Sequence, residues 1–199
     1  MEVFVRNGFT GASMDLVATQ AGVARRTLYN QFSSKEALFK ETIANLWKAV
    51  TITKTDKWSH IDDPVEGLTR FGTEIVEFWA VPAHVDMLRM VLAESLRSRQ
   101  LLSEFIEAGK GPAFRATVAY LELLRTVGRL KFEDSRLAAN QFLGLLNEPL
   151  LWQRVLGIGR PAPASYRAMV VRNAVRIFVG HYGVPAGRTP KPKRADGDR

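Results

Sequence analysis

The chain has 199 residues, a mass of 22.3 kDa and a formal net charge of +8, and 46% of its residues are hydrophobic. It has no cysteine, which excludes disulfides, thiolate zinc sites and thiol catalysis. Its three histidines form no metal-binding pair, so we expect no metal and no cofactor. No stretch of about 18 apolar residues could span a membrane, and the N-terminus lacks the signal-peptide pattern, so we expect a soluble, cytoplasmic protein.

The first predicted element is a short helix formed by residues 1–7. Gly8 is expected to end this helix, because glycine favours backbone conformations that a helix does not contain. The dipeptide Asn7-Gly8 also favours a type I′ turn, so a hairpin arm over residues 3–8 is the alternative. We favour the helix.

Residues 13–38 predict two short helices joined by a tight turn. Ser13 is a candidate N-cap for the first of them, and Gly22 supplies the permissive backbone that the turn requires. The second helix is expected over residues 24–31, with Leu28 and Phe32 facing inward. This is the helix-turn-helix arrangement, whose second helix enters the major groove of DNA.

The outward side chains of the second helix suit contacts with DNA. Arginine can bond bidentately to guanine, asparagine or glutamine to adenine, and threonine or tyrosine to phosphate. These side chains are Arg25, Arg26, Thr27, Tyr29, Asn30 and Gln31. A solvated polar face on a helical hairpin is the alternative.

A further helix is expected after residue 32. Ser33 and Glu36 have the spacing of a capping box. Lys35 would then stand at the positive N-terminus of that helix, where a phosphate is favoured. The same region therefore adds a candidate phosphate contact.

The middle of the chain has helical periodicity. Asp63 is expected to cap a helix with an apolar stripe from Leu68 to Trp79. A second run, residues 84–97, places Leu96 on its apolar face. Residues 109–112 are expected to break the pattern before a helix resumes at Phe114.

Residues 137–156 and 166–182 are more apolar than one buried stripe requires. Pro149 is expected to kink or divide the first of these segments. Because a surface helix needs only one apolar stripe, we interpret the pair as a dimer interface. A deeply buried monomer core is the alternative.

Composition predicts three parts: a DNA-binding domain in residues 1–46, a larger domain in residues 47–185 and a basic tail in residues 186–199. The polar stretch between Trp47 and Asp63 is the expected boundary. Residues 188–199 contain five basic and two acidic residues and almost no apolar ones, which predicts disorder. The tail is either solvated or an auxiliary nucleic-acid contact.

Six residues of the larger domain are candidates for lining a pocket. Glu94 is the most suggestive position, because it is a carboxylate within an apolar stripe and needs Arg89, Arg97 or a ligand as its partner. Ordinary core packing is the alternative for every candidate. The candidates are Phe78, Trp79, Met90, Glu94, Tyr120 and Phe142.

The residues do not favour an enzyme. Residues 157–162 match the pattern GxGxxA, but no strand precedes them and Pro161 opposes a following helix. Residues 11–15 lack the second glycine of a nucleophile elbow. We therefore expect no catalytic site. An interaction module that does not bind DNA is a further alternative.

The helix-turn-helix segment resembles the signature of TetR-family transcriptional regulators. The resemblance is dense over residues 7–46, and residues 89–146 resemble the AefR-like repressors within that family. Its residues are Gly22-Val23-Ala24-x-x-Thr27-Leu28-Tyr29-x-x-Phe32-x-Ser34-Lys35-Glu36-x-Leu38.

The resemblance implies an all-α homodimer with a three-helix DNA-binding domain and a larger helical domain for ligand binding and dimerisation. It implies base or nearby backbone contacts for Arg25, Arg26, Thr27 and Asn30. It implies phosphate contacts for Ser13, Tyr29, Gln31 and Lys35. The implied function is a repressor that leaves a near-palindromic operator when a small-molecule effector binds, and the implied dimer interface is the last two long helices.

Three features depart from the family pattern. Arg26 stands where glycine or proline is frequent, and Gln31 replaces a common histidine or tyrosine. Only seven residues precede Gly8, so we expect a first helix shorter than the family's usual one.

Overall fold

The computed structural model describes residues 1–48, 63–96 and 98–185. Within these ranges the chain is helical and has no strand, which confirms the predicted all-α fold; one isolated bridge pairs Leu130 with Gly183. No helix in the described ranges has both the length and the apolar character needed to cross a membrane. The helices are α1 (Glu2–Gly11), α2 (Met14–Ala21), α3 (Arg25–Gln31), α4 (Lys35–Lys48), α5 (Pro64–Ala80), α6 (Pro82–Ser95), α7 (Arg99–Phe105), the π-helical η3 (Ile106–Lys110), α8 (Gly111–Thr126), α9 (Ser135–Asn147), the π-helical η4 (Glu148–Trp152), α10 (Gln153–Val155) and α11 (Ala164–Tyr182).

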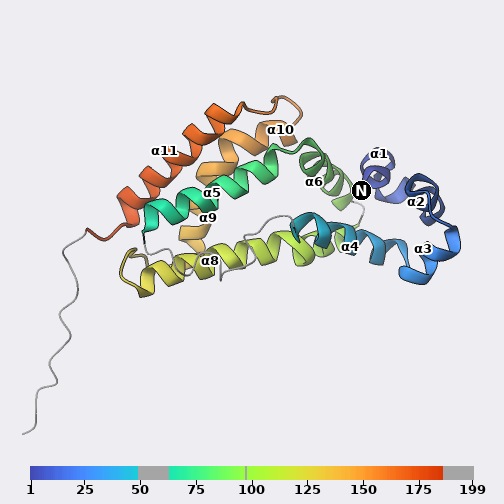
Figure 1. Cartoon of the computed structure of the whole chain (residues 1–199), viewed down its shortest axis with the longest axis horizontal. Helices are drawn as coiled ribbons and strands as arrows, with labels where there is room; N and C mark the ends of the chain where they lie inside the picture. Colours follow the sequence, from blue (N-terminus) through green and yellow to red (C-terminus); the bar gives the residue numbers. More distant parts are fainter. Residues whose placement is uncertain (49–62, 97, 186–199) are drawn as a thin grey trace, which may run out of the picture.

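The molecule is elongated, with α1, α2 and α3 at one end and α5, α8, α9 and α11 extending away from them (Figure 1). Two contacts join the small end to the rest: α1 packs on α6, and α4 packs on η3 and α7. Because α4 continues to Lys48, it passes the domain boundary expected at residue 46. The predicted linker after Lys48, the tail of residues 186–199 and Arg97 lie outside the described residues.

The predicted first helix is confirmed, and the hairpin alternative is wrong. Gly8 has φ 70° and ψ 170°, so it interrupts the helix as expected, but one more helical turn follows and α1 extends to Gly11. A side chain at position 8 would also meet α6, because a Cβ there would lie 2.7 Å from the Glu94 carboxylate. The kink is what requires glycine at this position, since the Glu94 carboxylate is the end of a flexible side chain and can move aside.

An aromatic cluster holds the small domain together. Phe4 and Phe39 are fully buried, and Phe9 packs beside them. The ring centroids of Phe39 lie 5.3 Å from those of both Phe4 and Phe9 in edge-on contacts. This geometry is favourable for aromatic pairs and fixes α1 against α4.

The core of the larger domain lies between α5, α8, α9 and α11. Phe71, Phe142 and Phe178 are fully buried, and their rings contact one another in that order, with centroids 6.3 Å and 5.2 Å apart. Gly72 lets α5 approach α11, since a Cβ there would lie 3.3 Å from Val171. The inward faces of α9 and α11 therefore belong to the core of a single chain.

The prediction of a break at residues 109–112 is wrong. The chain passes from α7 through the π-helical turn η3 into α8, and Pro112 stands in the first turn of α8. A π-helical turn changes the hydrogen-bond register of a helix, so glycine and proline are accommodated here without ending it. By contrast, Pro149 divides its segment as predicted, because it lies in η4 between α9 and α10.

One predicted stripe ends sooner than expected. Leu96 follows the last residue of α6 and is 93% exposed, so its placement on the apolar face is wrong. The periodicity continued past the helix end, because a pattern of apolar residues does not itself mark where hydrogen bonding stops.

Candidate functional site

The turn between α2 and α3 is built by local hydrogen bonds. Ser13 caps α2 as predicted, since its Oγ accepts a hydrogen bond from the Leu16 N–H at 3.1 Å. Gly22 ends α2 with φ 66° and ψ 26°, the left-handed conformation that glycine adopts without strain. The Val23 N–H then donates to the Ala18 carbonyl at 3.1 Å. These bonds set the direction in which α3 leaves the turn.

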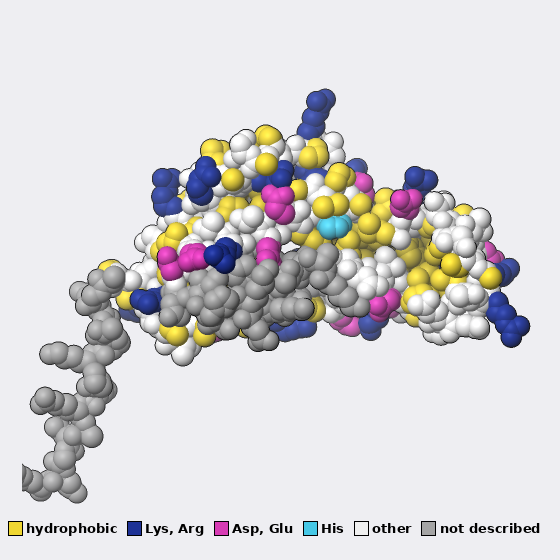
Figure 2. Space-filling view, in the orientation of Figure 1, with side chains coloured by type: hydrophobic (Ala, Val, Ile, Leu, Met, Phe, Trp, Pro, Cys, Tyr) yellow, Lys and Arg dark blue, Asp and Glu magenta, His cyan; other side chains and the backbone are white. Residues whose placement is uncertain are grey.

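α3 buries Leu28 and exposes nearly everything else. It lies at the far end of the molecule, where basic side chains project from the surface in Figure 2. Its exposed residues are those that the sequence predicted: Arg25, Arg26, Thr27, Tyr29, Asn30 and Gln31. The helix therefore offers a contiguous polar and basic face to a partner.

Arg25 is held in place within this face. Its Nε lies 2.5 Å from the Asp15 Oδ1, and its guanidinium carbon lies 5.6 Å from the centroid of the Tyr29 ring. Arg26 makes no ion pair among the described residues. Since the Arg25–Asp15 pair is exposed, it is weak, and Arg25 can exchange Asp15 for another acceptor at little cost.

The N-terminus of α4 differs from the prediction by one residue. Ser34, not Ser33, is the cap, since its Oγ accepts a hydrogen bond from the Ala37 N–H at 3.1 Å. The predicted capping box of Ser33 and Glu36 is therefore wrong; the helix starts at Lys35, which places Leu38 and Phe39 in the core. Hydrogen bonds from its own backbone and from Ser34 hold the pKa of Glu36 below its ordinary value.

Lys35 has a structural role that the sequence did not reveal. Its Nζ donates to the carbonyls of Phe9 at 2.8 Å, Ala12 at 3.0 Å and Thr10 at 3.4 Å, and lies 4.6 Å from the centroid of the Phe9 ring. The last carbonyls of α1 have no helical partner, and a cation is favoured at that end of a helix. Lys35 therefore closes the C-terminus of α1 from the start of α4.

Replacing Lys35 with methionine is expected to lower the free energy of unfolding by about 1–3 kcal/mol, because three carbonyls lose a charged donor. Urea unfolding followed by circular dichroism, at a fixed protein concentration, measures the change. Lys40→Met, at an exposed position of α4, is the matched control and should leave stability nearly unchanged. Equal stability of both variants and the wild type would show that the three contacts contribute nothing.

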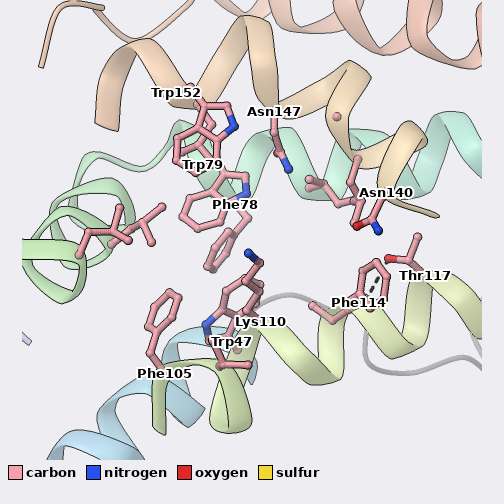
Figure 3. Close-up of a pocket in the computed structure, with 18 of the residues that line it drawn as sticks. Trp47, Phe78, Trp79, Phe105, Lys110, Phe114, Thr117, Asn140, Asn147 and Trp152 are labelled. Atoms are coloured by element: carbon pink, nitrogen blue, oxygen red, sulfur yellow. Dashed lines mark hydrogen bonds between the residues drawn. The ribbon is translucent and has the colours of Figure 1, made fainter. Parts of the chain in front are cut away.

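A cavity of about 310 Å³ lies in the larger domain, between the end of α4, α5, α6, α7, the turn η3, α8, α9 and η4 (Figure 3). Its wall is mostly apolar, and six of the described residues that line it are aromatic. Trp47 stacks on Phe78 with centroids 4.7 Å apart and meets Trp79 edge-on at 5.8 Å. The aromatic lining residues are Trp47, Phe78, Trp79, Phe105, Phe114 and Trp152.

Few polar groups reach this cavity. Among the described residues that line it, Lys110 is the one ionisable residue, and Thr117, Asn140 and Asn147 add a hydroxyl and two amides. The Thr117 hydroxyl is already used, since it donates to the Ala113 carbonyl at 3.0 Å. A wide apolar cavity with a few polar groups is typical of a small-molecule site.

Two of the six predicted pocket residues, Phe78 and Trp79, line this cavity. Met90 and Glu94 lie instead on the side of α6 that faces α1, where the Glu94 Oε2 accepts a hydrogen bond from the Thr10 hydroxyl at 2.9 Å. The hydrogen-bond partner of Glu94 is therefore Thr10, in the DNA-binding domain.

The remaining two candidates, Tyr120 and Phe142, belong to the core. The rings of both residues pack against Phe71, with centroids 5.7 Å and 6.3 Å away, and burial raises the pKa of Tyr120 to about 12. Trp47 was missed as a lining residue. A signal existed, since Phe39, Ile43 and Trp47 follow one another at intervals of four on the buried face of α4.

Both parts of the chain match known families. Residues 66–184 match the family model for the C-terminal domain of AefR-like transcriptional repressors, and residues 1–42 match the model for bacterial regulatory proteins of the tetR family. The chain belongs to the TetR family. It is therefore a transcriptional regulator of the DNA-binding repressor class, and the family is not one of enzymes.

Solved structures of TetR-family regulators have the same fold. A regulator from Mesorhizobium loti is 24% identical with a TM-score of 0.81, and the alignment covers 92% of each chain. One from Pseudomonas syringae pv. tomato is 27% identical with a TM-score of 0.72, covering 92% of this chain and 91% of the other. The flavonoid-responsive regulator FrrA is 29% identical with a TM-score of 0.71, covering 93% of each.

The similarity to curated proteins is confined to a short segment. A regulator of mycofactocin biosynthesis from Mycobacterium tuberculosis, MftR, is 47% identical over 38 residues. That segment is 19% of this TetR-family chain and 19% of the relative. The similarity therefore says nothing about the larger domain.

Proposed function

We propose that this TetR-family regulator binds a near-palindromic operator as a homodimer and leaves it when a small molecule occupies the aromatic cavity. The observation that carries the proposal is the path of α4. This helix begins next to α3 and ends with Trp47 in the wall of the cavity. One rigid element thus touches both the DNA-facing domain and the ligand site.

The exposed face of α3 is the proposed DNA surface. Arg25, Arg26, Thr27 and Asn30 would face bases and nearby backbone. Phosphate contacts are proposed for Ser13, Tyr29, Gln31 and Lys35. Exposure supports the assignments on α3, which stands at the tip of the molecule with only Leu28 buried. Ser13 is also exposed, whereas Lys35 is half-buried.

Lys35→Met also tests the proposed phosphate contact of Lys35. All three of its donors already reach carbonyls, so a phosphate would have to replace one of them. If Lys35 contacts phosphate, the slope of log affinity against log salt concentration falls by about one unit in the variant. An unchanged slope would leave Lys35 with its structural role alone.

Arg25→Ala is expected to weaken operator binding by about 1–3 kcal/mol and to relax the preference at one base pair, if Arg25 bonds to guanine. The operator is first selected from a random duplex pool, and affinities are then measured at a fixed salt concentration. Arg129→Ala, which removes the same charge from an exposed site at the end of α8, is the control. Equal affinity and unchanged base preference in Arg25→Ala would contradict the assignment.

The outward faces of α9 and α11 are the proposed dimer surface. Leu137 and Ile177 are 52% and 54% exposed in the single chain, and a partner on this surface would cover them. A groove between the two helices contains Gly144 and Ile177. A Cβ at Gly144 would meet nothing within 4 Å, so the backbone there is open to close approach by a partner helix. A two-fold axis would set two α3 helices about 34–36 Å apart, one turn of DNA.

Ligand control is proposed from the cavity and from its two links to the DNA-binding domain. Trp47 reaches the cavity from α4, and Glu94 on α6 bonds to Thr10 on α1. The similarity to a regulator named as flavonoid-responsive supports a small-molecule effector. A ligand releases DNA only if it binds better to a state whose α3 helices are wrongly spaced.

Operator affinity measured with and without saturating ligand tests this coupling, and a panel of flavonoids is the first set to try. Lower operator affinity with ligand, and lower ligand affinity with operator, is the expected reciprocal result. Additive binding of a ligand that occupies the cavity would contradict ligand control and leave DNA binding intact.

A further inference from the structure

One end of the cavity carries the positive charge of Lys110. Among the described residues that line it, Lys110 is the one ionisable residue, so none of their side chains offers the ammonium a carboxylate. Lys110 makes no ion pair or hydrogen bond among the described residues, and it is exposed. In Figure 3 the Lys110 side chain is drawn among the aromatic rings that line the cavity. A hydrated ammonium there costs little until a ligand displaces the water, and then it requires an anionic partner.

The N–H of Trp47 is not open to the cavity. Trp47 is 93% buried, and its indole N–H, which has no acceptor among the described residues, packs against Gly109. A ligand in the cavity therefore meets the Trp47 ring and not its N–H, and Lys110 is the charged donor at this end.

The π-helical turn η3 carries Lys110 next to the residue on which the Trp47 indole packs. Gly109 is the residue before Lys110, and any Cβ at Gly109 would collide with the Cδ1 and Nε1 atoms of Trp47. Because residue 109 is glycine, the indole of Trp47 can lie directly on η3, next to the backbone from which the Lys110 side chain extends. Extra π-helical turns occur frequently at functional sites, because they redirect a side chain within a continuous helix.

The rest of the wall favours a flat apolar body. Trp79, Phe114 and Trp152 present rings to the cavity together with Trp47 and Phe78. Aromatic rings pack well in offset and edge-on arrangements with other rings, and the amides of Asn140 and Asn147 can orient a polar substituent.

We propose that the cavity binds an aromatic acid, a planar apolar body with one carboxylate or comparably acidic group that pairs with Lys110. This inference rests on the proposed function of the cavity as the effector site. It adds the chemical class of the ligand and the residue that selects the charge.

The test uses two probes of one shape, biphenyl-4-carboxylate and its neutral amide, with affinities measured by titration calorimetry on the full chain. The carboxylate is expected to bind the wild type about tenfold more tightly than the amide, because a charged hydrogen bond is stronger than a neutral one. Lys110→Gln should remove this preference while leaving the amide affinity nearly unchanged. Lys110→Arg should keep it.

Lys131→Gln is the matched control, since it removes the same charge from an exposed loop residue that does not line the cavity. Equal binding of both probes to the wild type, failure of both to bind, or a preference that survives in Lys110→Gln would overturn the inference.

Operator release by each probe separates this inference from the proposed function. A carboxylate that binds in a Lys110-dependent way but leaves operator affinity unchanged would refute ligand control alone. Equal operator release by carboxylate and amide would refute the selection of an acid and leave ligand control standing.

Discussion

Replacing Ile177 with glutamate is expected to convert the proposed dimer into a monomer and to lower operator affinity by about 100-fold or more. Ile177 lies on the exposed face of α11, in the groove that α11 forms with α9. In a two-fold interface the substitution acts twice, because each partner presents the same surface. It would place two carboxylates in an apolar contact, and burying a charge there costs free energy.

The loss of affinity follows from linkage of the two half-sites. When one α3 is bound, the second binds as if at a high local concentration, which raises overall affinity by about 10²–10⁴-fold. A monomer retains only the affinity of a single half-site. Sedimentation measures the oligomeric state, and titration of a labelled operator at fixed salt measures affinity.

Ala168→Glu is the matched control for Ile177→Glu. It adds the same charge to α11 about half a helical turn around from Ile177, at an exposed position. The control should remain dimeric and bind operator like the wild type. A dimeric Ile177→Glu with unchanged operator affinity would show that this face of α11 is not the interface.

Replacing Phe39 with alanine is expected to lower the free energy of unfolding by about 3–5 kcal/mol and to abolish operator binding. Phe39 is fully buried and makes edge-on contacts with Phe4 and Phe9. The small domain has few other large buried side chains, so it cannot collapse to fill the space. The loss of these contacts would release α1 from α4 and misdirect α3.

Urea unfolding at a fixed protein concentration measures this change, and operator titration measures the consequence for binding. Phe39→Leu, which keeps most of the buried volume, should cost less than Phe39→Ala, and Lys40→Ala on the exposed side of α4 should cost almost nothing. If Phe39→Ala unfolded at the same urea concentration as Lys40→Ala, the cluster would not be the core of this domain.

Local features of the fold were predictable because their causes lie within a few residues. Ser13 and Asp63 cap the helices that follow them, and Gly22 turns the chain with a positive φ. Each depends on hydrogen bonds or sterics over two to four positions, and these are readable from the order of side chains. The predicted cap of α4 was wrong by one residue, because the cap is Ser34 and not Ser33. The start of α4 depends on which of its residues are buried in the core.

The exposed face of α3 was predictable for the same reason. A helix of seven residues that buries Leu28 must turn its other side chains outward. The pocket was different, because Phe78, Tyr120 and Phe142 all have the aromatic character expected of a pocket wall. Only the packing of α5, α8 and α9 decides which of them meets empty space.

The sequence by itself determined an all-helical chain, a helix-turn-helix with a basic outer face, and a C-terminal pair of helices too apolar for a surface. Only the tertiary structure decided that Lys35 closes α1, that Glu94 bonds across the domain contact, and that Lys110 and Trp47 meet in one cavity. Those contacts join residues far apart in the chain, and their partners depend on how helices pack. Periodicity identifies the buried face of a helix, but it does not say what that face is buried against.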